Sequence, residues 1–256
     1  MLPKALSHFS NWGAIQLAGP AKVLILSDIH SPYHSEAGLQ IALDHGKDQQ
    51  ADVVILNGDI LDFYSASKFE KDPRKRSLER EIETGIELLE YIREAFPKAR
   101  IIFKEGNHEE RWESFLIRKA SELLGVKKFT WQSVFELDRL KIEWVGEKRP
   151  IRLGKLNVIH GHEYRFAIAN PVNIARGLFN KAKAHALCGH FHQTHTHSEA
   201  TIEQRLIATF STGCLCDLHP DYAPINNWNQ GFADVDVTAS GNFHVNNLRI
   251  DQGELY

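Results

Sequence analysis

Five short apolar runs along the chain each end abruptly in polar residues. Near-continuous aliphatic and β-branched runs of this length are typical of strands buried on both faces. The predicted strands are Lys22–Ser27, Asp52–Leu56, Arg100–Lys104, Leu156–Ile159 and Ala184–Cys188. Each is followed by side chains able to bind a metal, often beside a glycine. Because ligands of open α/β sheets bind beyond the carboxyl ends of the strands, the pattern places a candidate site there.

Apolar residues at helical spacing fill the intervals between these runs. They predict helices over Glu36–Gln50, Ser77–Ala95, Glu109–Leu124 and Pro171–Ala182. The second of these carries Ile82, Ile86 and Leu89 on one face, and Pro97 lies just beyond its end. Proline cannot continue a helix, so the predicted boundary has a physical cause.

The second half of the chain has more β character. Further strands are predicted at Phe129–Trp131, Lys141–Val145, Ile151–Leu153, Arg205–Thr212, Phe232–Val237 and Phe243–Ile250. The last two are joined by a turn rich in Gly, Asn and Ser, as a hairpin requires. No internal repeat or flexible linker divides the sequence. We therefore expect one domain over residues 1–256, of mixed α/β (α+β) class with two sheets.

Composition and charge argue against nucleic acid attracted by overall charge and against a membrane as partners. The 256 residues carry 30 basic and 33 acidic side chains, a net charge of −3, so no global positive field attracts nucleic acid. The apolar runs are too short to span a bilayer, and Met1–Pro20 lacks the pattern of a signal peptide. An odd count of three cysteines argues against a disulfide framework. These features predict a cytoplasmic protein with no membrane partner, and they leave its oligomeric state open.

The chain contains 14 histidines, an excess that suggests metal or proton chemistry. Several of them fall in five short motifs, one at each predicted strand end: Asp28-Ile29-His30, Gly58-Asp59-Ile60-Leu61-Asp62, Gly106-Asn107-His108-Glu109, His160-Gly161-His162 and Gly189-His190-Phe191-His192. Each motif alone is weak evidence. Together they supply enough imidazole and carboxylate groups for two divalent transition metals, and such groups suit Zn, Mn, Fe and Ni.

In this order, the set D-x-H, G-D-x-x-D, G-N-H-E, H and G-H-x-H resembles the calcineurin-like metallophosphoesterases, and the resemblance covers the chain from Asp28 to His192. It implies a two-sheet β-sandwich flanked by helices. It also implies that Asp59 bridges two metal ions. The remaining ligands would be Asp28, His30 and His192 for the first ion, and Asn107, His160 and His190 for the second.

The resemblance further implies a reaction. A metal-bridging hydroxide would attack phosphorus directly, since metal binding lowers the pKa of water. His108 would be the catalytic histidine beside the scissile phosphate, and Asp62 and Glu109 would orient the ligands or His108 by hydrogen bonding. Two divalent ions are implied, with Mn foremost and Fe, Zn, Ni or Co also compatible.

Candidate substrate contacts lie close to these motifs. Arg111 or Arg165 could bind a phosphate through two hydrogen bonds. His162 could contact the phosphate or be a polar residue of the rim. Lys71 and Arg74 belong to a short basic run at 68–76 that could bind an anionic substrate or remain a solvated loop. We expect Trp228 to pack one end of the sandwich, with stacking on a base or sugar as the alternative.

Three hypotheses about function follow. The first is a phosphoesterase that hydrolyses phosphomono- or phosphodiesters, with diesters slightly favoured. The second is a nuclease or nucleic-acid end-processing enzyme, in which a nucleotide or nucleic acid would be the substrate. The third is a metal-bound interaction scaffold without catalysis. Phe63 stands where the protein serine/threonine phosphatases of this family have arginine, which argues against that branch.

Overall fold

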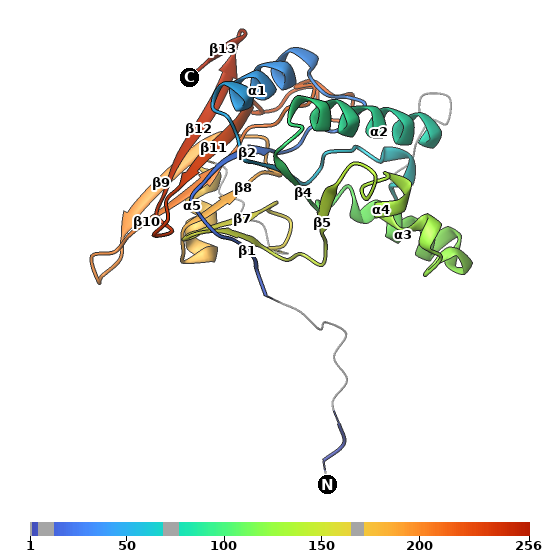
Figure 1. The fold of residues 1–256 in the computed structure, drawn as a ribbon, viewed down its shortest axis with the longest axis horizontal. Coiled ribbons are helices and arrows are strands. Elements are labelled where there is room, and N and C mark those ends of the chain that lie inside the picture. The colour runs from blue at the N-terminus through green and yellow to red at the C-terminus, as the bar shows by residue number, and fades with distance from the viewer. Residues whose placement is uncertain (1, 5–12, 69–76, 165–171) are drawn as a thin grey trace.

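Two mixed β-sheets pack face to face in a computed structural model that describes residues 2–4, 13–68, 77–164 and 172–256 (Figure 1). The larger sheet has the strand order β13 (Glu254–Leu255), β12 (Phe243–Asp251), β11 (Gln230–Val237), β2 (Ala21–Leu26), β3 (Val53–Asn57), β4 (Arg100–Lys104) and β5 (Ile142–Val145). The other sheet has the order β1 (Ile15–Leu17), β6 (Ile151–Leu153), β7 (Leu156–Ile159), β8 (Ala186–Cys188), β10 (Leu206–Ser211) and β9 (His195–Ala200). The expected two-sheet sandwich is confirmed.

Helices cover the outer faces of the sandwich. Helices α1 (Glu36–Asp48) and α2 (Leu78–Ala95) lie side by side over the larger sheet, and α5 (Ile174–Ala182) packs on the smaller one (Figure 1). Ser35, Ser77 and Asn173 accept hydrogen bonds from the first turns of α1, α2 and α5. These caps satisfy backbone donors that a helix start leaves unpaired.

The strand β2 shows why its sequence is apolar throughout. Val23 and Ile25 point into the core between the two sheets, whereas Leu24 and Leu26 point into the core under α1 and α2. Successive side chains of a strand face opposite sides, so a strand covered on both faces needs an apolar residue at every position. The same alternation holds in β3 and β4.

Parallel pairing brings the motif-bearing loops together. Strands β2, β3 and β4 run parallel to one another in the larger sheet, and β7 runs parallel to β8 in the smaller. Their carboxyl ends therefore lie at shared edges of the sandwich. The loops after these five strands carry all five sequence motifs.

Two sequence predictions need correction. The predicted strand Phe129–Trp131 is instead the end of a 3₁₀ helix, η3 (Lys127–Phe129), and the start of the helix α4 (Trp131–Val134). Trp131 packs against Phe63 and Phe135 here. The helix predicted at Glu109–Leu124 is shorter, because α3 (Glu110–Lys119) is followed by a separate 3₁₀ turn, η2 (Ser121–Leu123).

Other boundaries differ at their ends. The helix predicted from Pro171 begins at Ile174, and Pro171 itself lies outside the described residues. Strands β1, β9 and β13 were not among those predicted, and a further 3₁₀ turn, η1, spans Tyr64–Ala66. The three cysteines are buried and form no disulfide. In the described part of the chain, none of the helices has the length and apolar character needed to cross a membrane.

Candidate metal centre

One group of donor atoms gathers after β2 and β8. His30 Nε2 lies 3.3 Å from His192 Nε2, and Asp28 Oδ1 lies 3.3 Å from the same His192 atom and 4.0 Å from His30 Nε2. All three residues are buried. Two imidazoles and a carboxylate converging within this distance form a set that a divalent transition metal can use.

A second group gathers after β3, β4 and β7. His160 Nε2 lies 3.3 Å from Asp59 Oδ2 and 3.3 Å from Asn107 Oδ1. Asp59, His160 and His190 each offer a donor atom within 4.8 Å of the others. Asp59 also forms such a group with Asp28 and His30. The Asp59 carboxylate therefore lies between the two groups, where the sequence predicts a bridging ligand.

The backbone at this centre is held in a conformation that ordinary residues avoid. Five of the predicted ligands have positive φ: Asp28 (55°), His30 (53°), Asp59 (51°), His190 (70°) and His192 (59°). Left-handed backbone costs a non-glycine residue on the order of 1–3 kcal/mol and concentrates at functional sites. The fold thus holds these side chains in place at an energetic cost.

The hydrogen bonds of the ring nitrogens fit metal binding. His160 Nδ1 lies 2.8 Å from the Asn57 carbonyl oxygen, so it donates there and leaves Nε2 free to act as a ligand. His190 Nδ1 is buried and has no hydrogen-bond partner. The facing Nε2 atoms of His30 and His192 could share at most one proton between two lone pairs. A cation would satisfy all of these atoms, so the residues present fit a metal pair.

The carboxylates and imidazoles of the centre shift one another's pKa values. Burial alone would raise the pKa of Asp59, but the neighbouring His108 and His160 hold it well below its usual range. Burial alone would lower the pKa of His160 and His192, yet Asp59 and Asp28 raise these two pKa values to about 10. A metal needs neutral imidazoles as ligands, so binding a cation here would release protons.

His108 lies beside both groups. Its Nδ1 donates to the Asp62 carbonyl oxygen at 2.8 Å, and its Nε2 lies 2.7 Å from Arg111 Nη2. A guanidinium can only donate, so Nε2 is the acceptor and the imidazole is neutral. Burial, the largest cause, lowers the pKa of His108, although Asp59 opposes this shift. Arg111 also donates to the Asp62 carbonyl oxygen at 2.7 Å, which places its charge at the centre.

The buried carboxylates Asp62 and Glu109 contact the loops and rings of the centre. Asp62 Oδ1 lies 3.4 Å from His30 Nδ1 and 3.3 Å from His108 Nδ1. Glu109 accepts backbone hydrogen bonds across the loop after β3, from Asp59, Ile60 and Leu61, and one from Gly106. Burial and the neighbouring Asp59 raise the pKa of Glu109 to about 7, although the backbone hydrogen bonds lower it. Glu109 thereby fixes the loop that carries Asp59.

A buried ion pair beneath the centre was not found by sequence analysis. Lys104 Nζ lies 2.6 Å from Glu163 Oε1, and the lysine is fully buried at the end of β4. Glu163 also accepts hydrogen bonds from the backbone N–H groups of His160 and Gly161. The pair thus joins the two sheets below the second donor group. A lysine at the end of a strand predicted to be buried on both faces was the available signal, since a buried ammonium needs a carboxylate.

The unfolding free energy should depend on pH through Glu163. Burial alone would raise its pKa, but Lys104, His162 and His160 bring it below the usual 4.5. A carboxyl with a depressed pKa stabilises the folded state above about pH 4.5, and this contribution is lost as the pH falls further. We expect Glu163→Gln to lower the free energy of unfolding by about 3 kcal/mol at pH 7, because buried Lys104 then has no carboxylate partner.

The check is urea unfolding at pH 7, 5 and 3. The difference between wild type and Glu163→Gln should shrink toward pH 3. The matched control is Glu94→Gln on the exposed face of α2, which should leave the free energy unchanged at every pH. A constant difference between wild type and Glu163→Gln across this range would contradict the role of the ion pair.

The predicted substrate contacts have separate outcomes. Arg111 lies at the centre, as described. His162 Nε2 lies 3.0 Å from Glu110 Oε1, and Lys148 Nζ contacts the same oxygen at 3.1 Å. Glu110 thus contacts both of the other side chains, and the three residues lie after β4, β5 and β7. Lys71, Arg74 and Arg165 lie outside the described residues.

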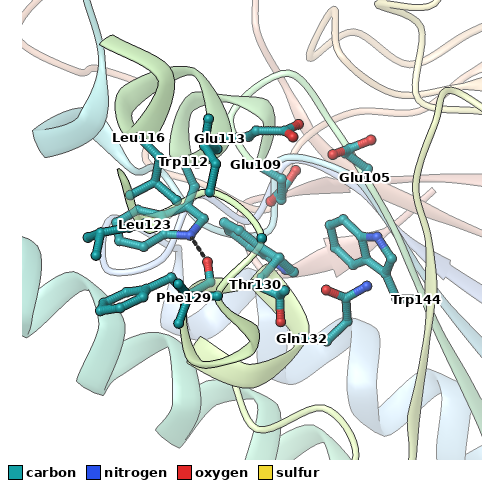
Figure 2. Close-up of a pocket in the computed structure, with 14 residues that line it drawn as sticks. Glu105, Glu109, Trp112, Glu113, Leu116, Leu123, Phe129, Thr130, Gln132 and Trp144 are labelled. Carbon is teal, nitrogen blue, oxygen red and sulfur yellow. Dashed lines mark hydrogen bonds between the residues drawn. The ribbon is translucent and has the colours of Figure 1, made fainter. Parts of the chain in front are cut away.

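A cavity of about 200 Å³ lies behind Glu109 and away from the donor atoms (Figure 2). Its walls come from α3, η2, η3, α4 and β5, and none of the predicted metal ligands lines it. In Figure 2, Trp112 donates a hydrogen bond to the Phe129 carbonyl oxygen at 2.7 Å, and Glu105, Glu109 and Glu113 lie along one side. This cavity is therefore separate from the donor groups of the centre.

The donor groups are consistent with a site for two metal ions. The family model of the calcineurin-like phosphoesterases matches residues 21–237, and the chain belongs to this family. It is 26% identical over 147 residues to the gene 54 protein of Mycobacterium phage L5. That match covers 55% of this chain and 56% of the phage protein, so the chain spans little more than half of that relative.

Solved structures with similar folds are more distant. Vps29 from Entamoeba histolytica is 13% identical, with 92% of this chain and 96% of that chain covered at a TM-score of 0.47. Yfce, a phosphoesterase from E. coli, is 14% identical, with 88% and 98% covered at a TM-score of 0.40. A dimetal phosphatase from Danio rerio is 11% identical, with 86% and 93% covered at a TM-score of 0.40.

Proposed function

We propose that this protein hydrolyses phosphoesters at a centre of two divalent metal ions. The observation that carries the proposal is Asp59, whose carboxylate belongs to both groups of buried donor atoms. Asp28, His30 and His192 would hold one ion, and Asn107, His160 and His190 the other. Two bound ions would lower the pKa of water and neutralise charge on the phosphate. Mn²⁺ is our proposed ion, because carboxylate, amide and imidazole donors all suit it.

The residues of the chain would divide the remaining work. Arg111 provides a positive charge next to His108 and can donate two hydrogen bonds to an anionic oxygen. At rest Nε2 of His108 carries no proton, because Nδ1–H is held by the Asp62 carbonyl oxygen and Nε2 accepts from Arg111. Once Arg111 turns to the substrate, Nε2 would take up a proton from water and give it to the departing ester oxygen. Asp62 holds the His108 ring by accepting from Nδ1. This arrangement orients Nε2 toward the reacting groups and fixes the tautomer.

We further propose that phosphodiesters are preferred over monoesters. A cavity lined by Tyr33, Asp62 and Trp228 opens beside His30. It can hold the second ester group of a diester, which a monoester lacks.

Hydrolysis of two chromogenic substrates tests the function. We expect the Mn²⁺-loaded full chain to hydrolyse bis-p-nitrophenyl phosphate faster than p-nitrophenyl phosphate, and a chelator to abolish both activities. A reversed ratio would contradict the diester preference alone. Metal-loaded protein that hydrolyses neither substrate would contradict the proposed function and favour a scaffold.

A further inference from the structure

A second cavity, of about 220 Å³, opens directly beside the metal centre. His30 and Asp62 of the centre form one end of it. The rest comes from Tyr33 and from the loop between β10 and β11, which contributes Asp217, Tyr222 and Trp228 among others. A group attached to a phosphate bound at the centre would enter this cavity, so its walls face the substrate.

The walls of this cavity are aromatic. The Trp228 ring lies 4.1 Å from the His192 ring, and the Tyr222 ring lies 6.2 Å from Trp228, both measured between centroids. Tyr222 and Tyr33 are 61% and 37% exposed. Large aromatic side chains are normally buried in a core or an interface, so two exposed rings beside a candidate active site indicate a surface for a planar ligand.

The loop that carries these rings is held in place before any ligand binds. Asn226 Nδ2 donates to the carbonyl oxygens of Leu218 and Ala223, and Asn226 Oδ1 accepts from the backbone N–H of Trp228. The Asn229 N–H bonds to the His192 carbonyl oxygen. The aromatic wall is therefore preorganised, which reduces the entropic cost of binding.

The polar groups of the cavity narrow the ligand class. Asp217 is tied to Tyr33 by its backbone N–H and accepts from the His219 N–H. Its second carboxylate oxygen can accept from an amino group of a ligand. In the described part of the chain no lysine or arginine lines the cavity, so it offers little to a second phosphate. The volume is below the roughly 300–1,000 Å³ of drug-sized sites and fits one planar ring system.

We propose that this cavity binds the base of a nucleotide whose phosphate, a diester in the preferred substrate, lies at the metal centre. The inference rests on the proposed function, since it assigns a substrate class to the same site. The Tyr222 and Trp228 rings meet edge-on at an interplanar angle of 62°. The base stacks on the face of Tyr222 with Trp228 at its side, and an amino group of the base donates to Asp217. Stacking discriminates nucleotides from sugar phosphates because only the former carry a planar π-system.

The test compares AMP with ribose 5-phosphate, which lacks the base. For the Mn²⁺-loaded full chain we would measure KM by phosphate release, or the inhibition constant against bis-p-nitrophenyl phosphate for a compound that is not hydrolysed. AMP should bind about 5- to 100-fold more tightly than ribose 5-phosphate. Tyr222→Ala should reduce this ratio severalfold, and Tyr222→Phe should retain it. Tyr91→Ala, an exposed tyrosine on α2, is the matched control and should leave the ratio unchanged.

Equal constants for AMP and ribose 5-phosphate in the wild type would overturn the proposal. A ratio that survives Tyr222→Ala would overturn it too. Both results leave the proposed function intact as long as the wild type hydrolyses bis-p-nitrophenyl phosphate. Loss of that hydrolysis in the wild type is the separate result that contradicts the proposed function.

Discussion

Asp59→Asn is expected to lower kcat/KM for bis-p-nitrophenyl phosphate by more than about 100-fold. Mutating even a residue that only hydrogen-bonds to a metal ligand reduces metal affinity or activity by about 10- to 100-fold. The Asp59 carboxylate lies 3.3 Å from His160 Nε2 and 3.7 Å from His108 Nε2, and it is buried. An amide of the same shape loses the negative charge and one acceptor oxygen. The bound metal should fall from two ions per chain to one or fewer.

The measurement pairs steady-state kinetics in Mn²⁺ with the metal content of the same preparations. Asp48→Asn is the matched control, because Asp48 is exposed at the end of α1 and belongs to none of the motifs. It should match the wild type in both readouts. Full metal content together with full activity in Asp59→Asn would show that Asp59 is not a bridging ligand.

His108→Ala is expected to lower kcat by about 10²- to 10⁴-fold, the usual contribution of general acid–base catalysis. His108 Nε2 lies 3.7 Å from Asp59 Oδ2 at the edge of the donor groups, and its Nδ1 bonds to Asp62. If this imidazole protonates the departing oxygen, its loss matters most for a leaving group of high pKa. The defect should therefore be larger with phenyl phosphate than with p-nitrophenyl phosphate.

Metal content separates this role from that of a ligand. His108→Ala should retain both ions, and His244→Ala, at an exposed position on β12, should behave as the wild type. A variant that loses an ion would make His108 a metal ligand. An equal defect for both leaving groups would assign it to charge stabilisation.

The strands and the candidate ligands could be predicted from sequence because both follow from the burial of strands between two layers. A strand covered on two faces must be apolar at every position, and the residues just after it project into the shared edge of the sheets. Thus Leu24 and Ile25 mark β2, and Asp28 marks the site. The left-handed backbone at Asp28 and Asp59 could not be predicted from sequence in the same way, because glycine is the residue type that usually indicates such a backbone.

Contacts between distant segments could not be predicted in this way. The pairing of Lys104 with Glu163 joins the end of β4 to the loop after β7 in the other sheet, and neither residue indicates its partner. The aromatic wall depends on how the loop before β11 folds back to Tyr33. Three hydrogen bonds of the Asn226 side chain hold this loop in place. The segment at Phe129–Trp131 became helical because Trp131 packs among other aromatic rings, which overrides a local preference for strand.

The most direct test of the central claim is a titration of metal-free protein with Mn²⁺ while the hydrolysis of bis-p-nitrophenyl phosphate and the number of bound ions are measured together. A centre built around Asp59 predicts that activity rises with occupancy and reaches its plateau when two ions are bound per chain, with protons released on binding. Protein that binds two ions and hydrolyses neither chromogenic ester would contradict a binuclear phosphoesterase.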